Sequence, residues 1–311
     1  MNLQPGIQKI KNKFQVSAHV PMKQYTRFKV GGPADLLAVP ETPRELLAIL
    51  AAAKDASVPV TIVGGGSNLL VSDQGIRGLV IVTTHLRSEI RSKKERDGTV
   101  LVCADAGERL SAVCRYTKTH GLTGLEFCAG IPGTFGGAVM MNAGTASEGI
   151  CRKIAYLDIL NLDTLVINTL KKQDLVFTYR CLELTNHLIL RAALALTAEN
   201  PETVQKRFAE NIKHKQTTQP VHLPSAGCFF KNPDPNSSAG KLIQDAGLKG
   251  AFCGDARVSE IHANYIVNCG SATCKDILAL KARIQKAVFD RFGIMLETEV
   301  KVTGNGGKTD E

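Results

Sequence analysis

Two glycine-rich stretches, about 65 residues apart, constrain the fold of this chain more than any other feature of its sequence. Residues 64–68 (GGGSN) directly follow the apolar run 58–63, and residues 130–138 (GIPGTFGGA) form the second stretch. Glycine has no Cβ and tolerates positive φ, so the N–H groups of such loops can approach an anion closely. Each stretch alone is more typical of a simple turn. Together, each beside a strand-like run, they predict a cradle for a pyrophosphate.

Two common phosphate-binding motifs do not fit these residues. The dinucleotide fingerprint Gly-x-Gly-x-x-Gly fits Gly64 and Gly66, but Leu69 stands at its third position, and residues 70–75 are typical of a strand and a turn. Near the end of the chain, residues 304–309 resemble a P-loop, but Val302 stands where that motif needs its first glycine. The sequence therefore argues against a Rossmann fold and a P-loop, and it predicts a disordered tail at 304–311.

The composition is typical of a globular protein with two or three compact units. The chain has 311 residues, of which 44% are hydrophobic and 22% are charged. We expect no membrane helix, because no apolar run reaches 18 residues, and no secretory signal, because the first residues contain no apolar core. The nine cysteines include no Cys-x-x-Cys pair or zinc-type cluster. They predict reduced thiols in a cytoplasmic protein without a metal site.

The net charge of +9 is compatible with a nucleic-acid surface, a polyanionic small substrate or solubility alone. The densest basic run, residues 87–96 (RSEIRSKKER), contains acidic residues and no aromatic ones. It is more typical of a solvated hairpin than of a nucleic-acid patch, and no RNA- or DNA-binding motif appears elsewhere. We therefore expect no nucleic-acid partner.

Local patterns predict an α+β chain. Thr42 and Glu45 have the spacing of a capping box that opens a helix to about Ala56, and a second helix is expected from Gly107 to His120. Strands are expected at 79–83, 100–104, 154–160, 164–168 and 187–197. After a boundary near 195–203, the pattern predicts helices at 201–215, 241–246 and 273–292, and a last strand at 294–302.

Three residues carry candidate chemistry. Cys228, in residues 225–233 (SAGCFFKNP), could be an exposed acid or nucleophile, or equally a buried strand cysteine; no histidine partner supports a cysteine hydrolase. Arg180 could bind a carboxylate through both arms of its guanidinium, although arginine at such a position is more often a surface ion-pair residue. Glu299 could face inward from the last strand or be a solvated edge residue. His262 is expected to be structural or to line a substrate site.

Taken together, these segments resemble the UDP-N-acetylenolpyruvoylglucosamine reductase (UDP-N-acetylmuramate dehydrogenase) family, flavoenzymes of bacterial peptidoglycan precursor synthesis. The resemblance spans roughly residues 15–303 and is specific in order and spacing. It rests on residues 26–35, 63–73, 130–144, 179–180, 225–233, 239–244 and 296–300.

The resemblance implies a vanillyl-alcohol-oxidase (PCMH-type) FAD-binding region, about residues 26–192, made of two α+β subdomains at 1–83 and 84–197. A C-terminal α+β substrate-binding domain would follow at 198–303. The short spacing between Arg180 and Asn200 leaves no room for the tyrosine-bearing insertion of one subtype, so the chain resembles the shorter subtype. FAD is expected to be non-covalent, because neither glycine loop contains a histidine or cysteine. The residues expected to contact FAD are Gly64, Gly65, Gly66, Ser67, Asn68, Leu69, Gly130, Pro132, Gly133, Thr134, Gly136, Gly137 and Ala138.

In such enzymes NADPH, the co-substrate, reduces FAD, and hydride then passes to the enolpyruvyl ether of UDP-N-acetylglucosamine, giving UDP-N-acetylmuramate. By resemblance, Arg180 and Glu299 stabilise the enolate-like charge that develops. Cys228, where many members carry serine, matches the proton donor. Lys231, Asn232 and Asn264 are the expected substrate contacts.

The family reading predicts a cytoplasmic monomer, without membrane or nucleic-acid partners, that serves cell-wall biogenesis and through it cell shape, the cell cycle and cell division. Another FAD-dependent oxidoreductase that uses molecular oxygen is the alternative enzyme. A non-catalytic nucleotide- or RNA-binding module is suggested only by the charge.

Overall fold

The computed structural model describes residues 4–145, 148–234 and 236–304, and these form two compact units. The first unit comprises Met1–Gln15, Ala38–Gly65 and Ile81–His214; the second comprises Val16–Leu37, Gly66–Val80 and Lys215–Glu311. Each unit is therefore assembled from segments far apart in the sequence. The three-part division by function remains a prediction, and the predicted disordered tail lies outside the described residues except for Gly304.

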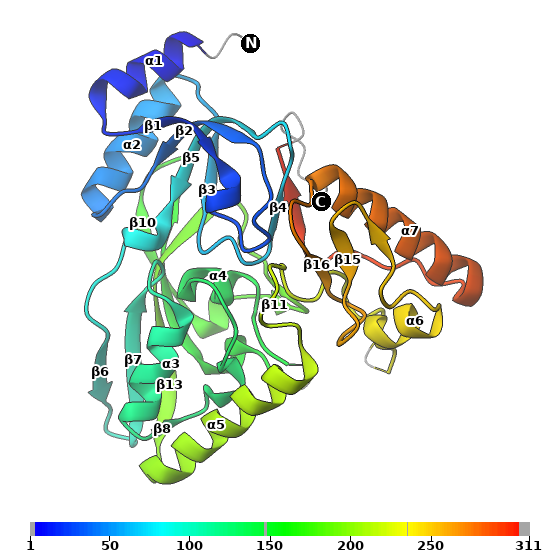
Figure 1. The fold of residues 1–311 in the computed structure, drawn as a ribbon. Helices are drawn as coiled ribbons and strands as arrows, with labels where there is room; N and C mark the ends of the chain where they lie inside the picture. Colours follow the sequence, from blue (N-terminus) through cyan, green and yellow to red (C-terminus); the bar gives the residue numbers. More distant parts are fainter. Residues whose placement is uncertain (1–3, 146–147, 235, 305–311) are drawn as a thin grey trace. The chain divides into compact units, whose positions relative to one another are not determined.

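A six-stranded antiparallel sheet is the framework of the first unit (Figure 1). Its strand order is β10 (Ile167–Lys171), β9 (Ile154–Asn161), β13 (His187–Ala198), β7 (Thr99–Asp105) and β6 (Arg91–Lys94), and β8 (Leu122–Thr123) also pairs with β13. Buried and half-buried residues alternate strictly along β7, as expected for a strand with one face against the core. The exposed strand β6 is part of the solvated hairpin predicted at residues 87–96.

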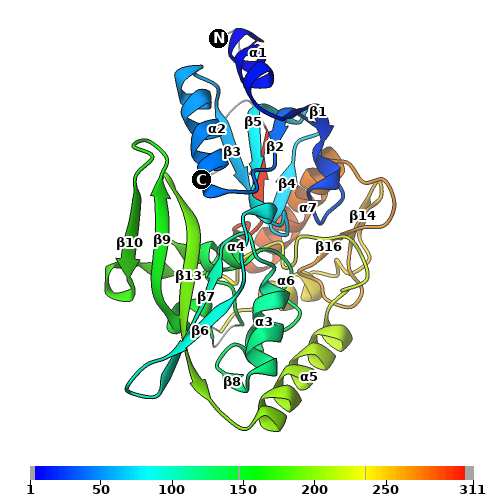
Figure 2. The same cartoon turned by 90° about the vertical axis from the view of Figure 1, so that its left-hand side faces the viewer.

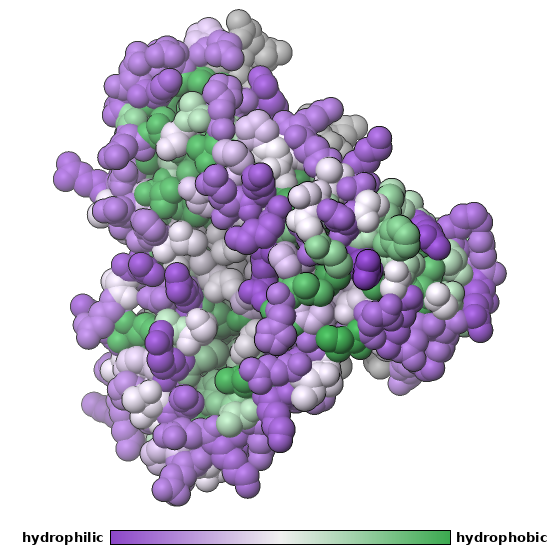
Figure 3. Space-filling model, viewed as in Figure 1, coloured by the Kyte–Doolittle hydropathy of each residue, from purple (hydrophilic) through white to green (hydrophobic). Residues whose placement is uncertain are grey.

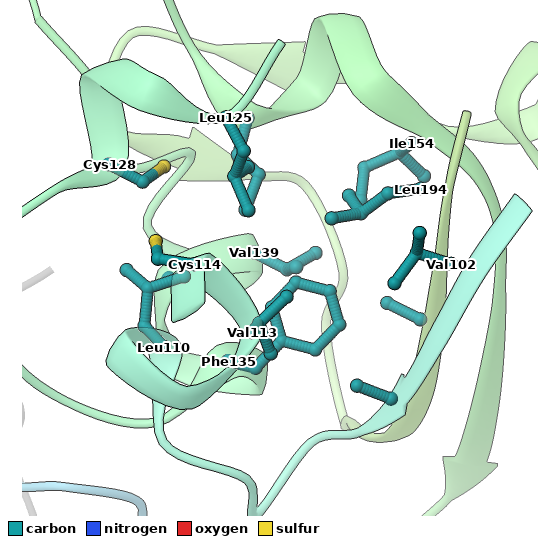
Figure 4. Packing of buried hydrophobic residues seen from close by; sticks show 14 of the residues in the cluster. Val102, Leu110, Val113, Cys114, Leu125, Cys128, Phe135, Val139, Ile154 and Leu194 are labelled. Atoms are coloured by element: carbon teal, nitrogen blue, oxygen red, sulfur yellow. The ribbon is translucent and has the colours of Figure 1, made fainter. Parts of the chain in front are cut away.

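Helices α3 (Leu110–Thr119) and α4 (Phe135–Met140) lie on one face of this sheet (Figure 2). Figure 4 shows their apolar side chains meeting those of the strands, for example Val113 and Phe135 beside Val102 and Leu194. Helix α5 (Pro201–Thr218) adds Val204 and Phe208 to the same core. Because this apolar face of the sheet is buried, α4 packs against it. The position of α4 in turn sets where the second glycine stretch lies.

The remaining elements of the first unit are α1 (Gln4–Lys13), α2 (Pro43–Asp55), β3 (Val60–Val63) and the small hairpin of β11 (Phe177–Thr178) and β12 (Cys181–Leu182). Thr42 caps α2, and its side-chain oxygen accepts the Glu45 N–H at 3.1 Å as predicted. The Glu45 carboxylate instead accepts the N–H of Glu41. Short 3₁₀ helices lie at Thr83–His85, Glu126–Cys128, Ile150–Lys153 and Lys172–Asp174 in this unit, and at Met22–Gln24 in the second unit.

The second unit contains three small groups of strands and two helices. β1 (Ser17–Pro21) pairs with β2 (Pro33–Ala38), next to β5 (Ile76–Val82), and β4 (Leu69–Val71) pairs in parallel with β17 (Lys301–Thr303). β14 (Phe252–Cys253), β15 (Ala256–Val258) and β16 (Ile266–Asn268) form an antiparallel sheet. The helices are α6 (Ala239–Asp245) and α7 (Cys274–Phe292).

Aromatic side chains and α7 build the core of the second unit. The Phe229 ring meets Phe28 and Phe230 at centroid distances of 6.4 and 5.1 Å. From α7, Ile277, Leu280, Ile284 and Val288 are fully buried in the same cluster. The opposite face of α7 is hydrophilic, at the right of Figure 3, as the helical period of its apolar residues requires. No helix among the described residues is long and apolar enough to cross a membrane.

Two predicted strands are placed differently. The strand expected at 164–168 lies at 167–171, because the Asn161 side chain accepts the N–H groups of Asp163 and Thr164 and holds those residues in a turn. Of the last predicted strand, 294–302, only the end forms a strand, since β17 covers 301–303. Residues before it bond to the neighbouring loop instead: Glu297 accepts from the Lys231 N–H, and the Glu299 N–H donates to the Phe229 carbonyl.

Candidate active site

The two glycine stretches meet within the first unit. Gly64 and Gly65 follow β3, and a Cβ placed on Gly65 would lie 2.7 Å from the Cα of Gly133. A Cβ on Gly64 would lie 2.5 Å from the Thr134 hydroxyl oxygen. Real Cβ atoms do not approach other atoms this closely, so the contact requires glycine. The predicted convergence of the two loops is therefore present in the structure.

The second stretch continues into α4, a helix that the sequence did not indicate because two of its six residues are glycine. Thr134 caps it by accepting the Gly137 N–H at 3.3 Å. Gly136 is buried, and its Cβ would lie 2.5 Å from the Cβ of Ala106. Gly137 is exposed, and a Cβ placed on it would meet the Thr134 hydroxyl oxygen at 3.2 Å and, among the described residues outside its own helix backbone, no other atom within 4 Å. Gly136 thus serves packing, whereas Gly137 leaves an open surface beside the loop.

The rest of the first stretch belongs to the second unit and is bonded there to the Glu299 segment. Gly66 has φ +60°, and a Cβ on it would lie 1.9 Å from the Tyr25 carbonyl oxygen. The Asn68 side-chain amide donates to the Glu299 carbonyl at 3.0 Å, and the Asn68 carbonyl accepts the Lys301 N–H at 3.1 Å. Leu69, at the start of β4, is paired in register with Lys301. Ser67 is half-buried between these anchored positions.

A cavity of about 460 Å³ in the first unit adjoins the glycine loops through Ala106, the residue that packs against Gly136. Its walls combine apolar side chains such as Leu86 and Ile189 with carboxylates. Asp105 forms a 2.9 Å ion pair with Arg191 and, through this hydrogen bond, raises the pKa of the guanidinium. Sequence reasoning missed this cavity, which is lined by Glu41, Pro43, Thr83, Leu86, Arg87, Ser88, Asp105, Ala106, Gly107, Asp158, Ile167, Ile189, Leu190 and Arg191.

Arg180, also in the first unit, lies in the turn between β11 and β12. Its φ is +57°, and its guanidinium stacks on the Tyr179 ring at 5.1 Å from the centroid. The Asn142 side chain donates to the Thr178 carbonyl at 3.0 Å. Because Asn142 lies just after α4, the helix into which the second glycine stretch continues, this bond ties the Arg180 turn to the end of that helix.

Cys228 and Glu299 are brought together in the second unit by backbone hydrogen bonds. The Phe229 N–H donates to the Asn264 carbonyl at 2.7 Å, and the Glu299 N–H donates to the Phe229 carbonyl at 2.9 Å. Cys228 is half-buried and lies in a loop, so the alternative of a buried strand cysteine is wrong. Glu299 is half-buried as well. A thiol and a carboxyl group therefore flank one backbone segment.

The side chains of the three expected substrate-binding residues make different contacts within the protein. The Lys231 ammonium lies 3.2 Å from the Glu297 carboxylate. The Asn232 side-chain oxygen accepts the N–H of Ala239, the first residue of α6, at 3.1 Å. Asn264 is 3% exposed, and its amide bonds both backbone groups of Phe230. The structure thus gives Asn264 a positioning role, and contact of these residues with a substrate remains a prediction.

Tyr265 is a neighbour of the candidate proton donor that sequence reasoning did not single out. Its side chain is buried, and Cys228 is one of the groups that act on the pKa of its phenol. Burial raises the pKa of the phenol most, Cys228 and then Glu299 raise it further, and Arg27 opposes them. Its ring also meets the His262 ring edge-on at 5.0 Å, and burial lowers the pKa of that imidazole. Among the residues that the structure describes, no cluster of three or more His, Cys, Asp or Glu could hold a metal ion.

Comparisons with known proteins find similarity along nine-tenths of this chain. Residues 219–303 match the family model of the UDP-N-acetylenolpyruvoylglucosamine reductase C-terminal domain, and residues 34–169 match an FAD binding domain. The UDP-N-acetylenolpyruvoylglucosamine reductase of Caldanaerobacter subterraneus is 42% identical over 286 residues, which cover 91% of this chain and 92% of that protein. The enzyme of the same name from Geobacter sulfurreducens is 41% identical, covering 92% and 93%.

A similar solved structure is the crystal structure of UDP-N-acetylenolpyruvylglucosamine reductase from Thermus caldophilus. It has a TM-score of 0.78 and 34% sequence identity, and covers 93% of this chain and 98% of that one. The predicted α+β fold with an FAD-binding region and a C-terminal domain of this type is confirmed.

Proposed function

The chain belongs to the UDP-N-acetylenolpyruvoylglucosamine reductase family, and from this we propose that it reduces the enolpyruvyl ether of UDP-N-acetylglucosamine to UDP-N-acetylmuramate with electrons from NADPH. The observation that carries the proposal is 42% sequence identity to the Caldanaerobacter subterraneus enzyme, over nine-tenths of each of the two chains. The reaction serves peptidoglycan precursor synthesis, and thereby cell-wall biogenesis, cell shape and division. We place it in the cytoplasm and expect the protein to act as a monomer.

The residues of the first unit fit FAD. The loop contact at Gly65 and Gly133 leaves no volume for a side chain, and the exposed surface at Gly137 lets a diphosphate reach backbone N–H groups. The adjoining cavity of about 460 Å³ is large enough for the adenosine end, with apolar walls for the base and carboxylates for the ribose hydroxyls. When bound, FAD supplies the hydride chemistry. We propose that it is held without a covalent bond.

Arg180 and Glu299 are proposed to act on the substrate carboxylate. Hydride addition to the terminal carbon leaves negative charge that spreads from the neighbouring carbon into this carboxylate. A guanidinium presents two parallel N–H donors to such a group. One preorganised donor aimed at developing charge is typically worth about 3–4 kcal/mol. Stacking on Tyr179 limits the freedom of the Arg180 side chain and supports this role.

Cys228 is proposed to give the proton that completes the reaction. The thiol transfers its hydrogen to the carbanionic carbon and becomes a thiolate, which water then reprotonates. An ordinary thiol has a pKa of about 8.5, so it is more acidic than serine but must be un-ionised to donate. The bonds from Phe229 to Asn264 and Glu299 hold the loop on which the thiol is carried.

The experiment that tests the proposal supplies the purified protein with NADPH and UDP-N-acetylglucosamine enolpyruvate under nitrogen. We expect a product heavier than the substrate by two hydrogens, in a one-to-one ratio with the NADPH oxidised, as measured by mass spectrometry. Oxidation of NADPH only in air, with hydrogen peroxide and no such product, would instead identify an oxygen-using flavin enzyme.

A further inference from the structure

Glu126 is the one acidic residue that is buried in the part of the chain that the structure describes, and the chemistry above gives it no role. It is 8% exposed. Its Oε1 accepts the Thr123 hydroxyl at 2.6 Å, and its Oε2 accepts the Gly124 N–H at 2.7 Å. Both oxygens of the carboxyl group therefore hold the turn that comes directly before it. Burial of such a group is tolerated because it is hydrogen-bonded.

Arg207, on α5, connects this turn to a second carboxylate. Its Nη1 lies 2.7 Å from Glu199 Oε2 and 3.9 Å from Glu126 Oε1, and it donates to the Thr123 hydroxyl oxygen at 3.3 Å. The Thr123 hydroxyl thus accepts from the guanidinium and donates to Glu126, so one hydroxyl joins the cation to the buried carboxyl group. Phe208, the next residue of α5, is buried in the core and fixes this turn of the helix.

The backbone runs from Glu126 through two hydrogen-bonded turns into the second glycine stretch. The Glu126 carbonyl accepts the Ala129 N–H at 3.0 Å, and the Cys128 carbonyl accepts the Ile131 N–H at 3.0 Å. Figure 4 shows Cys128 among the apolar side chains of the core, so these turns are anchored on their inner side as well. Because each turn is closed by its own bond, the orientation of Glu126 is passed on to Gly133, where the two glycine loops meet.

We propose that Glu126 is a positioning residue for FAD: its carboxyl group fixes the turn from which the second glycine loop starts, and so places the loop N–H groups before the diphosphate binds. The proposal rests on the proposed binding of the FAD diphosphate at the glycine loops. A loop that is already ordered binds more tightly than one that must be ordered by its ligand. The role requires no contact between Glu126 and the cofactor.

Two variants remove the bonds of Glu126 without changing the size of the side chain. Glu126→Gln places an NH₂ group, which cannot accept, opposite either the Thr123 hydroxyl or the Gly124 N–H. The dissociation constant of FAD should then rise about tenfold, on the usual strength of a hydrogen bond to a charged group. Thr123→Val should raise it by a smaller factor, because Glu126 keeps its bond to Gly124. In the double variant the rise should be smaller than the product of the two separate rises, since both changes break the same bond.

The test is equilibrium dialysis of the FAD-bound protein against graded FAD concentrations, with bound flavin measured by absorbance and folding by circular dichroism. Asp276→Asn is the matched control. Asp276 accepts the Thr273 hydroxyl at 2.7 Å and the Thr273 N–H at 2.9 Å, which are bonds of the same kind at the start of α7 in the second unit. We expect weaker FAD binding in Glu126→Gln and Thr123→Val, and an unchanged dissociation constant in Asp276→Asn.

Three results would overturn the proposal: an unchanged dissociation constant in Glu126→Gln, an equal rise in Asp276→Asn, or rises that multiply in the double variant. If Glu126→Gln does not fold, Thr123→Val and its comparison with Asp276→Asn decide in the same way. Failure of the proposed cofactor site gives a different result. A Gly137→Val variant that keeps its full complement of FAD would remove the glycine cradle itself, whatever the behaviour of Glu126→Gln.

Discussion

Replacing Asn264 by alanine should destabilise the protein through two backbone groups of Phe230. The Asn264 side-chain oxygen accepts the Phe230 N–H at 2.9 Å, and its nitrogen donates to the Phe230 carbonyl at 2.8 Å. Asn264 and Phe230 are 3% and 1% exposed, so water cannot replace the lost partner without a local opening. Each buried group left unsatisfied costs about 1–3 kcal/mol. We therefore expect a loss of about 2–6 kcal/mol in the free energy of unfolding.

The assay is urea unfolding followed by far-ultraviolet circular dichroism, with wild type and variant compared at equal slopes so that the midpoint reports stability. Asn12→Ala is the control, because its side chain makes an exposed hydrogen bond with Gln8. Exposed changes of this kind usually stay within about 0.5 kcal/mol. A loss below about 1 kcal/mol for Asn264→Ala would refute the reasoning, because the two bonds would then not hold the loop beside Cys228.

The remaining predictions concern catalysis, the cofactor and pH. Arg180→Ala and Glu299→Gln should each slow flavin reoxidation by substrate about 100-fold or more, the usual effect of removing one preorganised donor. Flavin reduction by NADPH should stay nearly unchanged, and stopped-flow traces that show equal slowing of reduction and reoxidation would contradict this. Gly137→Val should purify folded with little FAD, whereas Ala48→Val, on the exposed face of α2, should keep its FAD; circular dichroism and the flavin-to-protein ratio report both. Burial lowers the pKa of His262, so the unfolded chain binds the proton more tightly and stability should fall as pH drops below about 6.5. His262→Gln should flatten that part of the stability profile, and an equally steep fall in the variant would assign the effect to other groups.

The sequence alone predicted those structural features that only one or a few residue types can form. The loops at Gly65 and Gly133 were predictable because only glycine allows such an approach. The helix beginning after Thr42 was predictable because Thr42 caps the N–H three positions later. The helix at 273–292 was predictable from the helical period of its apolar residues, which are buried in the structure. The family resemblance then supplied the cofactor and the reaction class, which the FAD-domain match and the relatives support.

Features that depend on tertiary neighbours were not predictable from local pattern. Residues 294–300 alternate like a strand, yet their hydrogen bonds go to the loop at 229–231. The backbone bond from Phe229 to Asn264 joins residues far apart in sequence, and neither residue type alone indicates it. The cavity beside Ala106 is lined by residues far apart in the sequence, from Glu41 to Arg191, and no local pattern indicates that they come together. The roles of Arg180, Cys228 and Glu299 remain predictions.

The most direct test of the central claim is an anaerobic visible spectrum recorded in two steps. The protein as purified should show the absorption of oxidised flavin, and one equivalent of NADPH should bleach it. Addition of UDP-N-acetylglucosamine enolpyruvate, still without oxygen, should restore the absorption as the substrate takes up the electrons. A flavin that stays bleached with this substrate and recovers only in air would contradict the account, and so would a protein that binds no flavin.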